Sequence, residues 1–215
     1  MSSTLSNPMC DLCSCVFDTV MKPLELSRLA ERRAALLAEA GGRVLEVGAG
    51  TGANLRHYRY EAIEELVLSD LELRPVLARR VKRTVNEVGP ADATVRLISA
   101  SAERLPFADE SFDCVVTTLV FCSVPDQETG LGELYRVLRP GGRVLFLEHV
   151  RPRHAMLARV FEALNPAWRF ISGGCSLTRD TLLAFRRAGF ASDEPERFGK
   201  GVFVCGTAFK PRPRR

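Results

Sequence analysis

The stretch Arg43–Asn54, which reads RVLEVGAGTGAN, decides the fold of this chain. An apolar run typical of a β-strand is followed by three glycines at alternate positions and then by a helix start. Glycines let the backbone take positive φ values and approach a ligand closely, where a Cβ would collide. The unpaired N–H groups of the following helix would face that ligand. The stretch therefore predicts a turn that cradles a nucleotide.

Strand-like and helix-like segments alternate on both sides of this turn. Strands are expected at 44–47, 66–69, 94–98, 114–120 and 144–148, and helices at 24–40, 75–88 and 130–138. Residues 139–142 (RPGG) predict a tight stop between a helix and the next strand. This alternation is typical of βαβ units and a parallel sheet with helices on both faces.

The pattern changes after residue 148. Residues 152–174 read as an irregular or short-helical insertion, followed by a helix at 177–188 and strands at 190–197 and 202–209. Gly199–Gly201 suits a hairpin between these last strands. The predicted fold is α/β, with a Rossmann-like, seven-stranded, mostly parallel sheet and a C-terminal antiparallel hairpin. We expect an N-terminal helical cap at 1–40 and one domain at 41–215, with a substrate-side insertion at about 152–176.

Composition narrows the classes of function. The 215 residues are 46% hydrophobic, and no apolar run reaches the length of a membrane span. The polar start lacks a secretory signal, so we expect a cytoplasmic protein without a stable membrane span. A net charge of +4, carried partly by the tail at 210–215, and 7% aromatic residues give little sign of nucleic-acid binding. The sequence carries no signal for an oligomeric state.

Seven cysteines in such a chain favour reduced thiols over a disulfide framework. Cys10, Cys13 and Cys15 form a C-x-x-C-x-C cluster without a nearby fourth ligand, so no metal site is predicted. Metal-thiolate chemistry there, such as arsenite methylation, is an alternative.

The glycine turn suits two cofactors. Read as G-x-G-x-x-A, it fits a dinucleotide, and Asp70 lies about 20 residues on, where a ribose ligand belongs. Read as E-x-G-x-G-x-G, it fits S-adenosylmethionine. Glu46, at the strand end, would attract the ammonium of S-adenosylmethionine and repel a pyrophosphate, which favours the second cofactor.

Four motifs in order, LEVGAGTG, SAERLPF, ESFD and RVLRPGG, resemble the class I S-adenosylmethionine-dependent methyltransferases of the type 11 domain. The resemblance covers residues 36–150. It implies a glycine turn under the methionine and ribose, Asp70 on the ribose hydroxyls, and Leu71 against adenine. Many relatives carry aspartate where Ser101 stands, so Glu103 is expected to share recognition of the adenine edge. The cofactor-binding residues implied are Glu46, Gly48, Ala49, Gly50, Thr51, Gly52, Asn54, Asp70, Leu71, Ser101, Ala102, Glu103 and Leu119.

A narrower resemblance spans residues 43–181. The segments 118–124 (TLVFCSV), 148–150 (EHV), 165–168 (NPAW) and 174–179 (GCSLTR) look like the methyltransferase-like thiol S-methyltransferases, whose eukaryotic members methylate small alkyl thiols. This chain departs from them in its mostly polar start, where they carry an apolar anchoring segment. It also carries Phe203 where they tend to carry a histidine.

The resemblance implies methyl transfer to a small-molecule acceptor, a thiol above all, with S-adenosylhomocysteine as the product. In-line transfer from a sulfonium mostly requires alignment of donor and acceptor. A thiol must also ionise from a pKa of about 8.5. His149 is the candidate catalytic residue, as base or positioner, and Trp168, Cys175 and Arg179 are candidate substrate-binding residues. The alternatives are an O-, C- or N-methyltransferase of a quinone, lipid or metabolite, and a noncatalytic S-adenosylmethionine-binding protein.

Overall fold

The computed structural model describes residues 28–88, 94–172 and 174–213. The cluster Cys10, Cys13 and Cys15 and most of the expected N-terminal cap lie outside the described residues. Within them, the cap contributes helix α2 (Arg28–Leu37), which ends before Gly41 and Gly42, as the sequence predicts.

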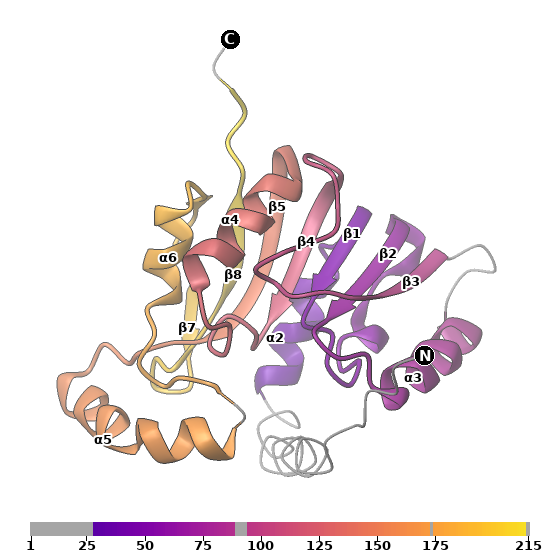
Figure 1. Ribbon diagram of the computed structural model, residues 1–215. Helices are drawn as coiled ribbons and strands as arrows, with labels where there is room; N and C mark the ends of the chain where they lie inside the picture. Colours follow the sequence, from indigo (N-terminus) through magenta and orange to yellow (C-terminus); the bar gives the residue numbers. More distant parts are fainter. Residues whose placement is uncertain (1–27, 89–93, 173, 214–215) are drawn as a thin grey trace.

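One sheet of eight strands forms the centre of the described structure (Figure 1). Its order is β3-β2-β1-β4-β5-β8-β6, with β7 also paired to β8. The first five strands are mutually parallel, and β8 runs antiparallel to β5. The α/β fold with an antiparallel C-terminal edge is therefore confirmed, but the described sheet has eight strands rather than the predicted seven, because the strand expected at 190–197 divides into two. The strands are β1 (Gly42–Val47), β2 (Ile63–Asp70), β3 (Thr94–Ser99), β4 (Phe112–Thr118), β5 (Leu138–His149), β6 (Ala191–Ser192), β7 (Glu196–Phe198) and β8 (Phe203–Phe209).

Helices cover both faces of this sheet. On one face, α2 and α3 (Pro75–Val88) pack Leu37 and Leu77 against the strands. On the other, α4 (Gln127–Val137) and α6 (Thr181–Arg187) contribute Leu134 and Phe185 to a second apolar cluster. Burial of these side chains on two faces explains why the inner strands are almost continuously apolar. Two short 3-10 helices, η1 (Leu55–His57) and η2 (Tyr60–Ala62), connect β1 to β2.

Strand ends differ from the sequence prediction at two places. The strand expected at 114–120 ends at Thr118, because Leu119 takes a φ of 59° and donates its N–H to Leu147 O at 2.7 Å. The stop expected at 139–142 lies inside β5, where the pairing with β4 passes from Leu138 directly to Arg143. Four residues thus bulge out of the register, and the helix α4 runs straight into the strand.

The insertion after β5 is one helix of 17 residues, where the sequence predicts an irregular or short-helical segment. Helix α5 (Ala155–Ile171) includes Pro166, a residue type that usually kinks or ends a helix. Its apolar side chains at Met156, Val160 and Leu164 follow a helical spacing, although all three are exposed in the described structure. In Figure 1, α5 lies beyond the end of the sheet rather than over a face.

The last strands form the predicted hairpin with a modification. Residues 190–197 divide into β6 and β7 around Pro195, which has no N–H to donate to a ladder. Strand β7 then pairs with β8 through a turn in which Gly199, Lys200 and Gly201 all take positive φ values.

Candidate active site

The strand order reverses between β1 and β4. The chain moves outward from β1 to β2 and β3, and then returns to place β4 on the other side of β1. Ligands of open α/β sheets bind beyond the carboxyl ends of the strands at such a reversal. Here those ends carry the glycine turn after β1 and the loop 119–124 after β4.

The three glycines of the turn all take the left-handed conformation. Their φ values are 72° at Gly48, 54° at Gly50 and 81° at Gly52. A Cβ at Gly48 would lie 2.4 Å from Val120 Cγ2, whereas a Cβ at Gly50 would meet nothing within 4 Å. Gly48 thus allows the two loops to touch, and Gly50 leaves open space where a ligand can approach the backbone.

Asp70, the last residue of β2, holds this turn. Its Oδ2 accepts the Gly50 N–H at 2.7 Å, and its Oδ1 accepts the Glu72 N–H at 3.2 Å. The next residue, Leu71, is 75% exposed although it is a large apolar side chain. A carboxylate beside an exposed apolar surface suits a ribose with a flat base next to it.

Glu46 is fully buried and its carboxylate is occupied by protein groups. Oε1 accepts from Asn54 Nδ2 at 2.9 Å, and Oε2 accepts from the Tyr58 hydroxyl at 2.6 Å. Asn54 Oδ1 in turn accepts from Arg33 Nη1 at 2.5 Å. Burial raises the pKa of Glu46 to about 7, while the bonds from Tyr58 and Asn54 oppose the rise. The structure therefore places Glu46 beneath the turn as a support, together with Asn54.

Ser101, Ala102 and Glu103 lie after β3, as predicted. The Ser101 hydroxyl accepts the Glu103 N–H at 3.2 Å, and Glu103 Oε1 accepts the Asp126 N–H at 2.7 Å. Glu103 is therefore oriented by the start of α4. Ala102 packs against the second apolar cluster.

The loop after β4 is held by Glu148, to which sequence reasoning gave no role. Its Oε1 accepts from Thr117 Oγ1 at 2.9 Å and from the N–H groups of Val120 and Phe121 at 3.2 Å each. Its Oε2 accepts the Cys122 N–H at 3.4 Å. Burial raises the pKa of Glu148 to about 7 against these bonds.

His149 follows Glu148 at the end of β5 and is 9% exposed. Its ring stacks at 6.1 Å on Phe161 of α5 and meets Phe203 edge-on at 5.5 Å. Its Nδ1 is buried with no hydrogen-bond partner among the described residues. Burial lowers the pKa of His149 to about 4, against a hydrogen bond with the Ser176 backbone. The ring is therefore neutral at pH 7, and so weak a base suits positioning better than removal of a thiol proton.

The three predicted substrate-binding residues cluster beside the loop 119–124. Cys175 is buried beside Cys122, whose thiol lowers the pKa of Cys175 while burial opposes it. Trp168, the only tryptophan of the chain, keeps its indole N–H buried without a hydrogen-bond partner among the described residues. Arg179 donates to the carbonyls of Phe121 at 3.2 Å and Pro125 at 3.4 Å, so its described contacts are with the loop.

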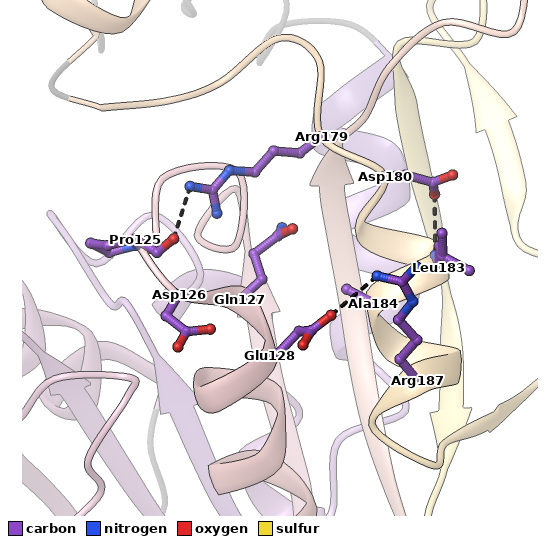
Figure 2. Close-up of a pocket in the computed structure, with 9 residues that line it drawn as sticks. All are labelled: Pro125, Asp126, Gln127, Glu128, Arg179, Asp180, Leu183, Ala184 and Arg187. Carbon is purple, nitrogen blue, oxygen red and sulfur yellow. Dashed lines mark hydrogen bonds and ion pairs between the residues drawn. The ribbon is translucent and has the colours of Figure 1, made fainter.

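A surface pocket of about 390 Å³ opens between the starts of α4 and α6 (Figure 2). Arg179 crosses its mouth toward Pro125, and Arg187 pairs with Glu128 at 3.2 Å across it. None of its lining residues belongs to the glycine turn or to the end of β2. The pocket is therefore separate from the strand ends where a cofactor is expected.

Sequence reasoning missed several residues that build this site. Glu148 lies in the segment 148–150, and a carboxylate at the end of an apolar strand is itself a sign of a buried polar role. An arginine on the apolar face of a helix is another such signal, which Arg33 gives. Tyr58 and Thr118 give none, because both residue types are common in such positions.

Comparison with known proteins identifies the class. Residues 45–146 match the family model of a methyltransferase domain. The chain is 36% identical to the human thiol S-methyltransferase TMT1A over 149 residues, 69% of this chain and 59% of that protein. It is 32% identical to the ubiquinone/menaquinone biosynthesis C-methyltransferase UbiE of Pseudomonas fluorescens (strain Pf0-1), over 62% of this chain and 52% of that protein.

The matched domain and these relatives place the chain among the class I S-adenosylmethionine-dependent methyltransferases. Within that class, it is similar to the thiol S-methyltransferases. The chain spans about three fifths of the length of the human protein TMT1A. The crystal structure of the [4+2]-cyclase SpnF has the same fold, with a TM-score of 0.66 and 21% identity over 86% of this chain and 80% of that one. Fold alone therefore leaves the reaction open. No helix of the described residues is long and apolar enough to cross a membrane.

Proposed function

We propose that the chain binds S-adenosylmethionine beyond the ends of β1 and β2 and transfers its methyl group to a small-molecule thiol. The observation that supports this cofactor is the surroundings of Gly50. A Cβ there would meet nothing within 4 Å, and the Gly50 N–H donates to Asp70 at 2.7 Å. Gly48–Gly52 would lie under the methionine and ribose, with Asp70 on the ribose hydroxyls. Leu71 would cover adenine, whose polar edge would meet Ala102 and Glu103.

The bound cofactor supplies a methyl group already activated by the sulfonium charge. The protein then has to align the acceptor and exclude water from it. We assign the alignment to the loop 119–124, including Leu119. Glu148 holds this loop beside the glycine turn through the N–H groups of Val120 and Phe121. His149, neutral and with its Nδ1 unpaired within the described part of the chain, would accept a hydrogen bond from the acceptor.

The similarity to the human thiol S-methyltransferase supports the choice of a thiol. The insertion at about 152–176, most of which is helix α5, would border the acceptor with Trp168 and Cys175. The similarity to a C-methyltransferase supports a second candidate, transfer to carbon of a quinone-like ring.

Two measurements test this proposal. Isothermal titration should show binding of S-adenosylmethionine and none of NAD, and binding of NAD alone would refute the cofactor. Release of S-adenosylhomocysteine should then be followed with alkyl thiols, phenols, amines and a quinol. Turnover with the thiols supports the proposed acceptor. Turnover with the quinol alone supports the second candidate, and tight cofactor binding without turnover supports a noncatalytic protein.

A further inference from the structure

Cys122 and Cys175 bring two distant segments of the chain together. Cys122 lies in the loop after β4, and Cys175 lies between α5 and α6. The Ser176 N–H donates to Cys122 O at 2.8 Å, and a Cβ placed on Gly174 would lie 3.8 Å from Ser123 O. The two backbones therefore run side by side at this point, with both thiols free and buried.

Other hydrogen bonds fix the segment that carries Cys175 against α5 and against the loop that carries Cys122. Asn165 of α5 accepts the Leu177 N–H at 2.8 Å through Oδ1, and Arg179 donates to Phe121 O at 3.2 Å. The methyl transfer proposed above needs no covalent enzyme intermediate, so neither thiol acts as a nucleophile in it, although Cys175 would border the acceptor. We propose that Cys122 and Cys175 form a redox-active dithiol, which a peroxide converts to a disulfide that joins the two segments.

The two sulfurs differ in a way that assigns their roles. The neighbouring Cys122 thiol lowers the pKa of Cys175 most, and the charge of Arg179 lowers it further, against burial. The Cys175 thiol, together with burial, raises the pKa of Cys122 well above its usual value. Cys175 is therefore the nucleophile and Cys122 the resolving thiol, because the thiolate is the reactive form.

The chemistry balances with the peroxide as the only oxidant. The Cys175 thiolate attacks one peroxide oxygen, the O–O bond breaks, and a sulfenic acid forms with release of hydroxide, which takes a proton to become water. The Cys122 sulfur then attacks the Cys175 sulfur and displaces hydroxide, which leaves as water with the Cys122 proton. Two thiols and one peroxide thus give one disulfide and two waters. The disulfide requires Cα atoms about 4.4–6.8 Å apart, a range that suits two backbones joined by the bond from Ser176 N–H to Cys122 O.

Peptide mapping of the whole chain tests the proposal directly. The protein is treated with graded hydrogen peroxide, alkylated, digested without reductant and analysed by mass spectrometry. A crosslinked pair of peptides containing Cys122 and Cys175 should appear at the lowest doses and disappear with dithiothreitol. Recovery of both residues as alkylated thiols, while other cysteines oxidise, would overturn the proposal.

Variants separate the two roles. Cys122→Ser should leave Cys175 as a sulfenic acid that dimedone traps, whereas Cys175→Ser should leave Cys122 unmodified. Cys205→Ser, a change at another buried thiol on β8, is the matched control and should still form the crosslink. A crosslink of Cys175 to any other cysteine in the parent protein would contradict the pairing. These outcomes are read by mass and do not depend on methyl transfer.

Discussion

Substitution of Glu148 by glutamine should change how stability depends on pH. The folded pKa of Glu148 is about 7, above its ordinary value of 4.5, so between these values the folded state binds more protons than the unfolded state. The stability contribution of Glu148 is therefore present at low pH and falls as the pH rises through about 7. From about pH 5.5 to about pH 8 this loss amounts to about 2 kcal/mol, at about 1.4 kcal/mol per unit of pKa.

Glutamine should abolish this loss and keep most of the hydrogen bonds. Its carbonyl oxygen can accept from Thr117, Val120 and Phe121 as Oε1 does, and only the Cys122 N–H at 3.4 Å loses its acceptor. An unpaired buried donor costs about 1–3 kcal/mol, so the variant should be less stable than the parent at the lower pH. At the higher pH the two should approach each other.

Urea unfolding of both proteins at the two pH values measures this difference. Burial lowers the pKa of His57 and His149 to about 4, so these histidines stabilise the fold less as the pH falls below about 6.5. Their effect is shared by parent and variant and cancels in the comparison. A gap between the two proteins that stays constant from one pH to the other would refute the reasoning. Glu148→Ala, which strands all four donors, should be less stable than Glu148→Gln at both.

Three further changes test the site. Gly48→Ala should lower the unfolding free energy by about 3 kcal/mol, because the new Cβ would meet Val120 at 2.4 Å and the φ is positive. Gly50→Ala, which only strains the backbone, should lower it by about 1 kcal/mol. Urea unfolding in which Gly50→Ala is the more destabilising change would contradict this. Asp70→Ala should weaken S-adenosylmethionine binding by about 1–3 kcal/mol in isothermal titration, and unchanged affinity would remove Asp70 from the site. His149→Gln should slow turnover without moving the midpoint of the pH–rate profile, because a group whose pKa is about 4 stays neutral above pH 6; a moved midpoint would make His149 the base.

Much of the order of elements could be predicted from sequence because the inner strands are apolar and because Gly41, Pro75 and Gly189 stand at or near helix ends. Helix α3 has the expected bounds, Pro75–Val88. The end of β4 could not be predicted, since an apolar run continues past Thr118 while the left-handed Leu119 breaks it. Local pattern also failed at Pro166, where the helix continues through a residue that usually ends one.

The positions of the site residues were easier to predict than their contacts. The sequence correctly brings Gly48, Asp70 and Glu103 to one edge of the sheet, because parallel strands end there together. It could not indicate that Glu46 binds Tyr58 and Asn54 beneath the turn. Both partners follow the glycine turn, 8 and 12 residues after Glu46, and only the path of the chain there brings them back to its carboxylate.

Helix α2 belongs to the site because its residue Arg33 forms hydrogen bonds beneath the glycine turn. From outside the matched residues 45–146, its guanidinium bonds Asn54 at 2.5 Å and Thr118 at 3.2 Å, next to the ends of β1 and β4. A shortened protein that starts at the first strand would leave the buried Glu46 with one fewer counter-charge. Engineers who fuse, trim or graft this domain should therefore cut upstream of α2. A force or a binding event that displaces α2 would therefore also act on Asn54 under the glycine turn.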